Sequence, residues 1–225
     1  MLRIVCINLA EQPQHQPWDT QKNTLVSAIE KINPHILVIK NAQAKSDLND
    51  GKDQGLQLYE ESKIFSFYHY SVRATQGDEK IGCAILAKFP IIEKHRIKVN
   101  TGDGRPVTFL KSSFERPLGK FDLYIADLSA IKTSTCTLGE ASTFLSTGNT
   151  LSVISGTATA ANFNPFVNVG FIAATISGED EPGEEHFWLS HEIAEGFNKL
   201  ELENFDNVKA YVLELNIKMH ELNIY

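Results

Sequence analysis

The stretch Ile81-Gly-Cys-Ala-Ile-Leu-Ala-Lys-Phe-Pro-Ile91 carries the pattern that decides the fold. Its first seven residues form a short apolar run, which predicts a β-strand over residues 81–87. Lys88-Phe-Pro90 then predicts a turn, because proline ends regular pairing. The alternating charges of residues 91–99 predict a further strand immediately after that turn. The middle of the chain is therefore expected to be rich in strands.

The segment before this stretch predicts a β-α-β opening. Residues 2–9 form a β-branched run that is typical of a buried strand. Asp19 or Thr20 is expected to cap a helix that carries apolar residues at helical spacing and ends at Asn33-Pro34. Residues 36–39 are continuously apolar, which predicts an interior strand covered on both faces.

The segments after the stretch predict more strands. Residues 107–114 and 121–128 flank Glu115-Arg-Pro-Leu-Gly-Lys120, which predicts a hairpin. Composition assigns the remaining segments: a loop at 42–55, strands at 65–70, 151–155, 187–190 and 209–217, a helix at 137–149, an irregular or partly helical stretch at 163–175, and an acidic solvated loop at 178–185. Without a repeat or a long linker, residues 1–225 are expected to form one domain.

Composition limits the functional classes. The net charge of −7 gives no general support for nucleic-acid binding, which needs several cationic groups to neutralise phosphates. Cys6, Cys83 and Cys136 are odd in number and widely spaced, so they predict reduced thiols in a cytoplasmic protein rather than disulfides or a zinc site. The apolar run at residues 2–9 is too short for a membrane span, and neither a signal peptide nor a membrane segment is expected.

Five segments, taken in order, resemble the endonuclease/exonuclease/phosphatase family. They are Ile4-Val-Cys-Ile-Asn-Leu9, Pro34-His-Ile-Leu-Val-Ile-Lys-Asn41, Ile81 to Ile91, Leu123-Tyr-Ile-Ala-Asp-Leu-Ser129 and Leu151-Ser-Val-Ile-Ser-Gly-Thr-Ala-Thr159. The third is the most specific match, to a Gly-x-Ala-Ile-Leu-Ser-Arg-Phe-Pro-Ile word. The resemblance implies an α/β fold, a four-layer α/β/β/α sandwich of two packed mixed β-sheets flanked by helices.

The same resemblance implies a site for Mg²⁺ or Mn²⁺ that this chain has largely lost. The family's main metal ligand is a glutamate, and its position carries Asn41, preceded by Lys40. The other family positions fall on Ser129 in place of a histidine, Thr157 and Thr159 in place of Asp and Asn, Asn8, Asp206, and Asn207 in place of a second histidine. Neither threonine is a general base at neutral pH. Only Asn8 and Asp206 match, and each also fits an ordinary structural role at a strand end or a turn.

Three hypotheses follow. The first is a catalytically inactive relative, a pseudoenzyme that acts as a binding or interaction module, with a protein as its potential partner and no cofactor. The second is an active Mg²⁺-dependent or Mn²⁺-dependent phosphodiesterase or nuclease with rearranged ligands, namely Glu11, Asp19 or Asp127 together with Asp206. The third is an unrelated α/β domain, which a single doubly wound parallel sheet would support.

Overall fold

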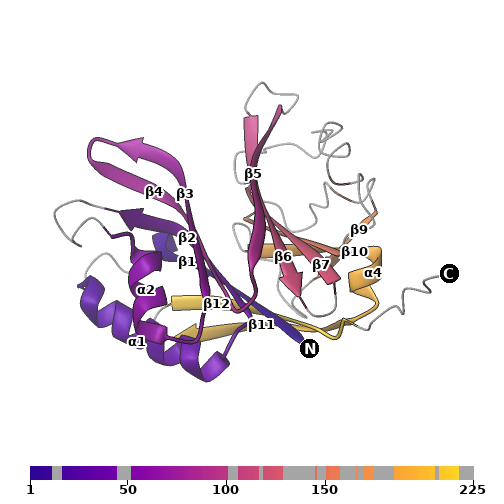
Figure 1. Cartoon of the computed structure of the whole chain (residues 1–225), viewed down its shortest axis with the longest axis horizontal. Helices are drawn as coiled ribbons and strands as arrows, with labels where there is room; N and C mark the ends of the chain where they lie inside the picture. The colour runs from indigo at the N-terminus through magenta and orange to yellow at the C-terminus, as the bar shows by residue number, and fades with distance from the viewer. Residues whose placement is uncertain are drawn as a thin grey trace. The chain divides into compact units, whose positions relative to one another are not determined.

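The protein folds into two compact units. The structure is a computed structural model and describes residues 1–11, 17–44, 52–100, 106–116, 119–128, 145, 151–157, 166, 170–174, 185–205 and 208–217. The first unit comprises Leu2–Ile91 and Lys199–Glu214, and the second comprises Met1, Ile92–Asn198 and Leu215–Tyr225. Each unit is built around one six-stranded sheet (Figure 1).

The first unit opens with the predicted β-α-β arrangement. Strands β1 (Leu2–Asn8) and β2 (Ile36–Ala44) pair in parallel and are connected by helix α1 (Trp18–Ile32). The helix ends at Asn33, whose left-handed backbone (φ 54°) lets its N–H bond the carbonyl of Ile29 at 2.8 Å. The prediction of this opening is confirmed except for the helix cap: α1 begins at Trp18 after Pro17, so Asp19 and Thr20 lie inside its first turn.

The loop predicted for residues 42–55 is wrong at both ends. Strand β2 continues through Ala44, and a helix that the sequence did not predict, α2 (Gln54–Ser62), begins at Gln54. Asp53 caps α2 by accepting a hydrogen bond from the Leu56 N–H at 3.0 Å. The buried residues of α2 are Gly55, Leu58 and Ser62, so one large apolar residue was too weak a periodic signal.

The sheet of the first unit is mixed. Its order is β11-β12-β1-β2-β4-β3, with β3 at Phe67–Gln76, β4 at Glu79–Ala87, β11 at Phe197–Phe205 and β12 at Val208–Leu215. Strand β4 pairs antiparallel with both β2 and β3. Strand β12 confirms the last predicted strand but ends at Leu215 rather than residue 217, and the edge strand β11 was not predicted.

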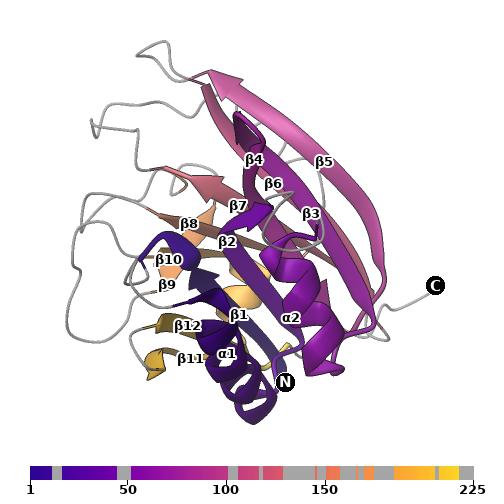
Figure 2. The same ribbon diagram turned by 90° about the vertical axis from the view of Figure 1, so that its left-hand side faces the viewer.

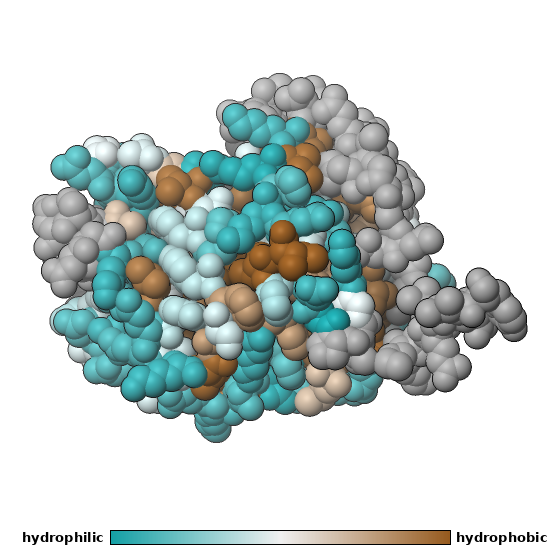
Figure 3. All heavy atoms as spheres, viewed as in Figure 1, coloured by the Kyte–Doolittle hydropathy of each residue, from teal (hydrophilic) through white to brown (hydrophobic). Residues whose placement is uncertain are grey.

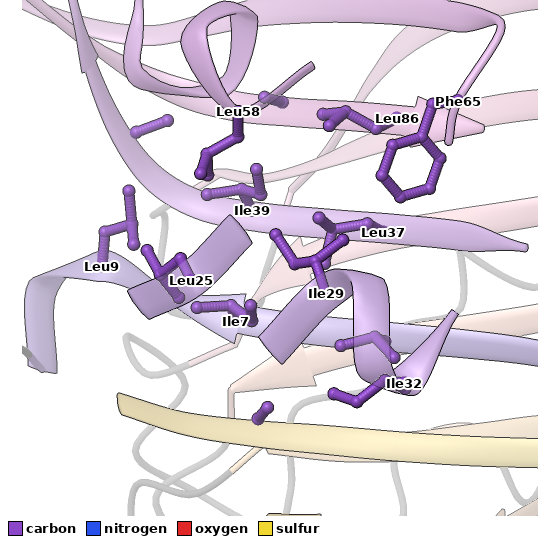
Figure 4. Close-up of a cluster of buried hydrophobic side chains, with 14 of the residues drawn as sticks. Ile7, Leu9, Leu25, Ile29, Ile32, Leu37, Ile39, Leu58, Phe65 and Leu86 are labelled. Atoms are coloured by element: carbon purple, nitrogen blue, oxygen red, sulfur yellow. The ribbon is translucent and has the colours of Figure 1, made fainter. Parts of the chain in front are cut away.

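Both helices cover the same face of this sheet. The buried core cluster joins Leu25 and Ile29 of α1 and Leu58 of α2 to side chains of β1, β2, β4 and β12 (Figure 4). Figure 2 shows α1 and α2 in front of the strands β1 and β2. Because strand side chains alternate in direction, membership of this cluster shows which face each strand residue occupies. Val5, Ile7 and Leu9 face the helices, so Asn8 faces the opposite side.

The second unit is also a mixed sheet, with the order β5-β6-β7-β8-β10-β9. Its strands are β5 (Ile91–Asn100), β6 (Pro106–Arg116), β7 (Gly119–Asp127), β8 (Leu151–Thr157), β9 (Phe171–Ala174) and β10 (Glu185–Ser190). The antiparallel pairing of β6 with β7 confirms the predicted hairpin, whereas β7 and β8 are parallel. Two mixed sheets with helices confirm the predicted α/β class and its sheet type, and they contradict the single parallel sheet of the third hypothesis.

Three further expectations for the second unit have different outcomes. Strand β9 lies in the stretch 163–175 that was expected to be irregular or partly helical, and its length of four residues explains why no alternation was visible. The short helix α4 (His191–Ala194) was not predicted. The helix expected at 137–149, apart from Leu145, and the acidic loop expected at 178–185, apart from Glu185 in β10, lie outside the described residues.

Aromatic residues dominate a core cluster on one face of the second sheet. Phe166 packs edge-on against Trp188, with ring centroids 5.0 Å apart, and Trp188 is fully buried. Phe109 and Tyr124 bring β6 and β7 into the same cluster. Phe114 and Phe121 are buried too, but outside this cluster.

The face of the protein shown in Figure 3 is mostly polar where it is coloured. Hydrophilic residues predominate on the face shown in Figure 3, with hydrophobic side chains gathered near its middle. Among the described residues, the large hydrophobic side chains with the greatest exposure are Met1, Ile92, Ile172 and Phe197. No helix within the described ranges has the length and hydrophobicity needed to cross a membrane.

Candidate functional site

The end of β1 and the inner part of β2 bring two of the predicted site residues together. The two strands pair in parallel with Asn8 opposite Lys40. At this point the Asn41 Nδ2 donates a hydrogen bond to the Asn8 Oδ1 at 2.7 Å. Residues 33 positions apart in the sequence thus form one pair of side chains, on the sheet face away from the two helices.

A β-bulge places Asn41 on that face. The register of β2 with β4 shifts between Lys40 and Ala42, so Asn41 is an extra residue without a partner on β4. Ile39 and Ala42 both belong to the helix-side core, although strict alternation would place them on opposite faces. Asn41 has φ 55°, in the left-handed region that asparagine tolerates better than most residues.

Polar side chains continue across the sheet from this pair. Asn8, Lys40, Cys83 and Ser71 occupy successive register positions on β1, β2, β4 and β3, so their side chains lie in one row on one face. Three of them are buried, with Lys40 8% exposed, Cys83 7% and Ser71 9%. We refer to these four residues as the polar row. The sequence did not predict the polar row, although the segment Gly82-Cys-Ala84 contains one of its members.

The donor set around the Asn pair is poorly suited to a divalent cation. The Asn8 Oδ1 also accepts a hydrogen bond from the Ala10 N–H at 3.2 Å, so both of its acceptor positions are used. Mg²⁺ prefers carboxylate oxygens, whereas the side chains here are two neutral amides and the cationic Lys40. Within the described parts of the chain, no three His, Cys, Asp or Glu residues form a group able to hold a metal ion.

The remaining predicted site residues are less completely placed. Thr157 ends β8 opposite Asp127 of the parallel strand β7, and only the backbone of each is described. The other predicted positions, Ser129, Thr159, Asp206 and Asn207, lie outside the described residues. The second hypothesis invoked Asp19, which is exposed on α1 and lies 3.5 Å from Lys22. Because α1 covers the other face of the sheet, Asp19 is not grouped with the Asn pair. The other acids of that hypothesis, Glu11, Asp127 and Asp206, have side chains that are not described.

A second polar group lies on the helix side and holds α2 in place. Asp53, 7% exposed, caps α2 and accepts a hydrogen bond from the Tyr68 hydroxyl. The Tyr70 hydroxyl lies 3.0 Å from the Ala42 carbonyl, and burial, followed by the charge of Asp53, raises the pKa of Tyr70 to about 12. Because every member has a structural partner, we assign this group to stability rather than to the site.

Comparison with solved structures identifies the fold. No protein-family model matches the sequence, and no curated protein matches it. An endonuclease/exonuclease/phosphatase family protein from Leptotrichia buccalis matches 96% of this chain and 99% of its own, with a TM-score of 0.71 and 9% identity. The human Nocturnin catalytic domain matches 96% of this chain and 93% of its own, with a TM-score of 0.66 and 13% identity.

A mannosyl-6-phosphatase from Bacteroides thetaiotaomicron gives a similar result. It covers 96% of this chain and 99% of its own, with a TM-score of 0.62 and 13% identity. The chain therefore has the fold of the endonuclease/exonuclease/phosphatase family over nearly its whole length, as the short words in its sequence implied. At these identities the likeness concerns the fold, and function has to be argued from the site.

Proposed function

We propose that this protein is a non-catalytic binding module that uses the phosphoesterase fold without metal-dependent hydrolysis. The hydrogen bond between Asn41 and Asn8 carries this proposal. By resemblance, position 41 is where the family has its main metal-binding glutamate. Here it holds a neutral amide that donates to Asn8. Two amides that satisfy each other need no cation to hold them together, whereas a buried carboxylate does.

The charge of Lys40 supports the same conclusion. Its side chain is buried and lies on the same face as Asn8, one residue before Asn41. A divalent cation bound at the Asn pair would share this face with the cationic side chain of Lys40, and like charges repel more strongly where water is excluded. The polar row therefore favours a site without a metal ion.

The sequence at the other family positions adds to this argument. Ser129, Thr157, Thr159 and Asn207 stand where the family has a histidine, two residues that position or activate water, and a second histidine. None of the four is a general base near neutral pH. A protein partner in a cytoplasmic setting is part of the proposal, and the buried, unbridged thiols of Cys6 and Cys83 are consistent with a reducing compartment.

A hydrolysis assay tests the proposal directly. Purified protein is incubated with Mg²⁺ or Mn²⁺ and with single-stranded DNA, RNA, a nucleotide or a phosphoinositide, beside an Asn8→Ala/Asn41→Gly control. We expect equal background rates for both proteins. Hydrolysis by the natural protein that disappears in the control, and also on adding a chelator, would contradict the proposal and support an active phosphodiesterase.

Metal titration provides a second readout that does not depend on the substrate. Mn²⁺ added to the natural protein is expected to give no saturable heat of binding at millimolar concentration. A Lys40→Gln/Asn41→Glu variant removes the opposing charge and supplies a carboxylate, so we expect it to bind Mn²⁺ more tightly. Binding that is equally tight in both proteins would show that Lys40 and Asn41 do not exclude the metal.

A further inference from the structure

The hairpin of β6 and β7 carries a buried arginine, Arg116, with two nitrogen atoms that have no hydrogen-bond partner among the described residues. Arg116 is the last residue of β6, is 8% exposed, and lies opposite Gly119 of β7. Its Nε and Nη2 are both shielded from solvent and have no hydrogen-bond partner in the described part of the chain. A guanidinium that leaves two buried N–H groups without a hydrogen-bond partner is costly, so this residue needs an explanation.

The two unpartnered atoms form one recognition surface. Nε–H and the adjacent Nη2–H lie side by side on one edge of the planar guanidinium, the fork that binds both oxygens of a carboxylate or phosphate. The guanidinium stacks on Phe121, with its central carbon 5.7 Å from the ring centroid. The ring supports one flat face of the cation but cannot accept the in-plane hydrogen bonds.

Glu115 and Asp122, the acidic residues of this hairpin whose side chains are described, do not neutralise Arg116. Glu115 is exposed, and as the preceding strand residue it points to the opposite face. Asp122 forms an ion pair with Lys111 at 2.9 Å, on the face of Tyr124 rather than that of Phe121. Burial lowers the pKa of Arg116, although a guanidinium stays charged near neutral pH.

We infer that Arg116 is the recognition group of an oxyanion site, one that binds a carboxylate or a phosphate group through the Nε and Nη2 fork. The site is separate from the positions that the family resemblance implies in this unit. Those positions follow or end β7 and β8, and β7 spans about 27 Å from Gly119 to Asp127 at ~3.4 Å per residue. The ligand completes the hydrogen bonds that the fold leaves open.

Thermal unfolding in defined anions tests the site. The full-length protein is measured in a chloride buffer and again with inorganic phosphate or with acetate at matched ionic strength. We expect the preferred oxyanion to raise Tm by about 3–6 °C at a concentration about tenfold above Kd. The phosphate and acetate arms show which oxyanion the fork prefers. Arg116→Met and Arg116→Lys are expected to lose the shift, because neither presents a planar fork.

The matched control is Lys120→Met on the same hairpin, because Lys120 is exposed and its removal changes the net charge equally. It is expected to keep the full shift. In chloride alone, Arg116→Met is expected to be as stable as the natural protein or more so, since methionine replaces an unpaired buried charge. Two results would overturn the inference: a large loss of Tm in Arg116→Met under every condition, which means an internal partner, or the same response to oxyanions in Arg116→Met and the natural protein, which means an adventitious ion only.

Discussion

At the scale of single residues, Asn41 combines two properties that few other side chains offer together. Its backbone lies in the left-handed region, with φ 55°, and its amide donates to Asn8. Asparagine reaches this conformation at lower cost than most residues because its short polar side chain bonds locally. The residue therefore stabilises the bulge that places it beside Asn8, whether or not the site binds a ligand.

Two substitutions at Asn41 separate these contributions. Asn41→Gly keeps the left-handed backbone and loses only the side-chain hydrogen bond, so we expect a loss of about 1 kcal/mol in the free energy of unfolding. Asn41→Ala additionally forces an alanine into the left-handed region, which adds about 1–2 kcal/mol. Urea unfolding measures both values. Equal losses in the two variants would mean that the backbone conformation has no energetic role here.

At the scale of elements, the pairing of β3 with β4 depends on Gly82. A Cβ at this position would lie 2.3 Å from the backbone carbonyl oxygen of Ser71 and 2.8 Å from the Tyr70 ring. Both distances are shorter than real Cβ contacts, and the first involves backbone that cannot move aside without breaking the ladder. The ring of Tyr70 thus fills the space that a side chain would occupy.

Gly82→Ala is therefore expected to cost more than 2 kcal/mol of stability, as other overpacked substitutions in tight sites do. Gly77 at the tip of the same hairpin provides the control: its φ is 59°, but a Cβ there meets nothing within 4 Å. Gly77→Ala should cost only about 1–2 kcal/mol, from the left-handed backbone. Thermal or urea unfolding ranks the two variants, and a milder effect at Gly82 than at Gly77 would refute the steric account.

At the scale of the whole molecule, the sheet of the first unit contains an ion pair between residues near the two ends of the chain. Arg3 on β1 reaches Glu214 on β12, with the Nε at 2.7 Å and the Nη2 at 2.6 Å from the same carboxylate oxygen. Glu214 is 5% exposed. Residues Ile92–Asn198 of the second unit lie in the sequence between the two parts of the first unit. The contact therefore joins two residues that are 211 positions apart.

Arg3→Met should reduce the free energy of unfolding by about 3 kcal/mol, because it leaves the buried carboxylate of Glu214 without its main partner. Lys199 lies 3.9 Å from the same carboxylate and its side chain is 41% exposed, so Lys199→Met is the matched control and should cost less than about 1 kcal/mol. An Arg3→Met/Glu214→Met double variant should recover part of the loss. If it is less stable than Arg3→Met alone, the penalty does not arise from an unpaired charge.

Prediction from the sequence succeeded where neighbouring residues supply the signal. The helix α1 has apolar positions at helical spacing and a left-handed asparagine at its end, so its existence and its C-terminal limit follow from local chemistry. The hairpin of β6 and β7 follows from two alternating runs around a proline and glycine turn. The prediction missed helix α2. Part of its contact with the sheet is made by Gly55 packed against Ala84, and a glycine adds nothing to a hydrophobic periodicity.

The substituted site was predicted only in part. Asn8 and Asn41 could be named from their places at the ends of the predicted strands, and the lack of a carboxylate at position 41 is visible without any structure. Their hydrogen bond, and the row that extends to Cys83 and Ser71, depend on the register between strands and on one bulge. A register shift of one residue reverses every side chain, and no local pattern specifies it.

The sequence by itself determined the α/β class, the β-α-β opening, the central hairpin and the absence of a carboxylate at position 41, because each depends on residue types and spacing along the chain. Only the tertiary structure decided that Asn41 binds Asn8, that Lys40 is buried beside them, and that the fork of Arg116 is left without a partner. The physical reason is that burial and hydrogen-bond satisfaction depend on distant segments, and a charge becomes costly only once those segments exclude water.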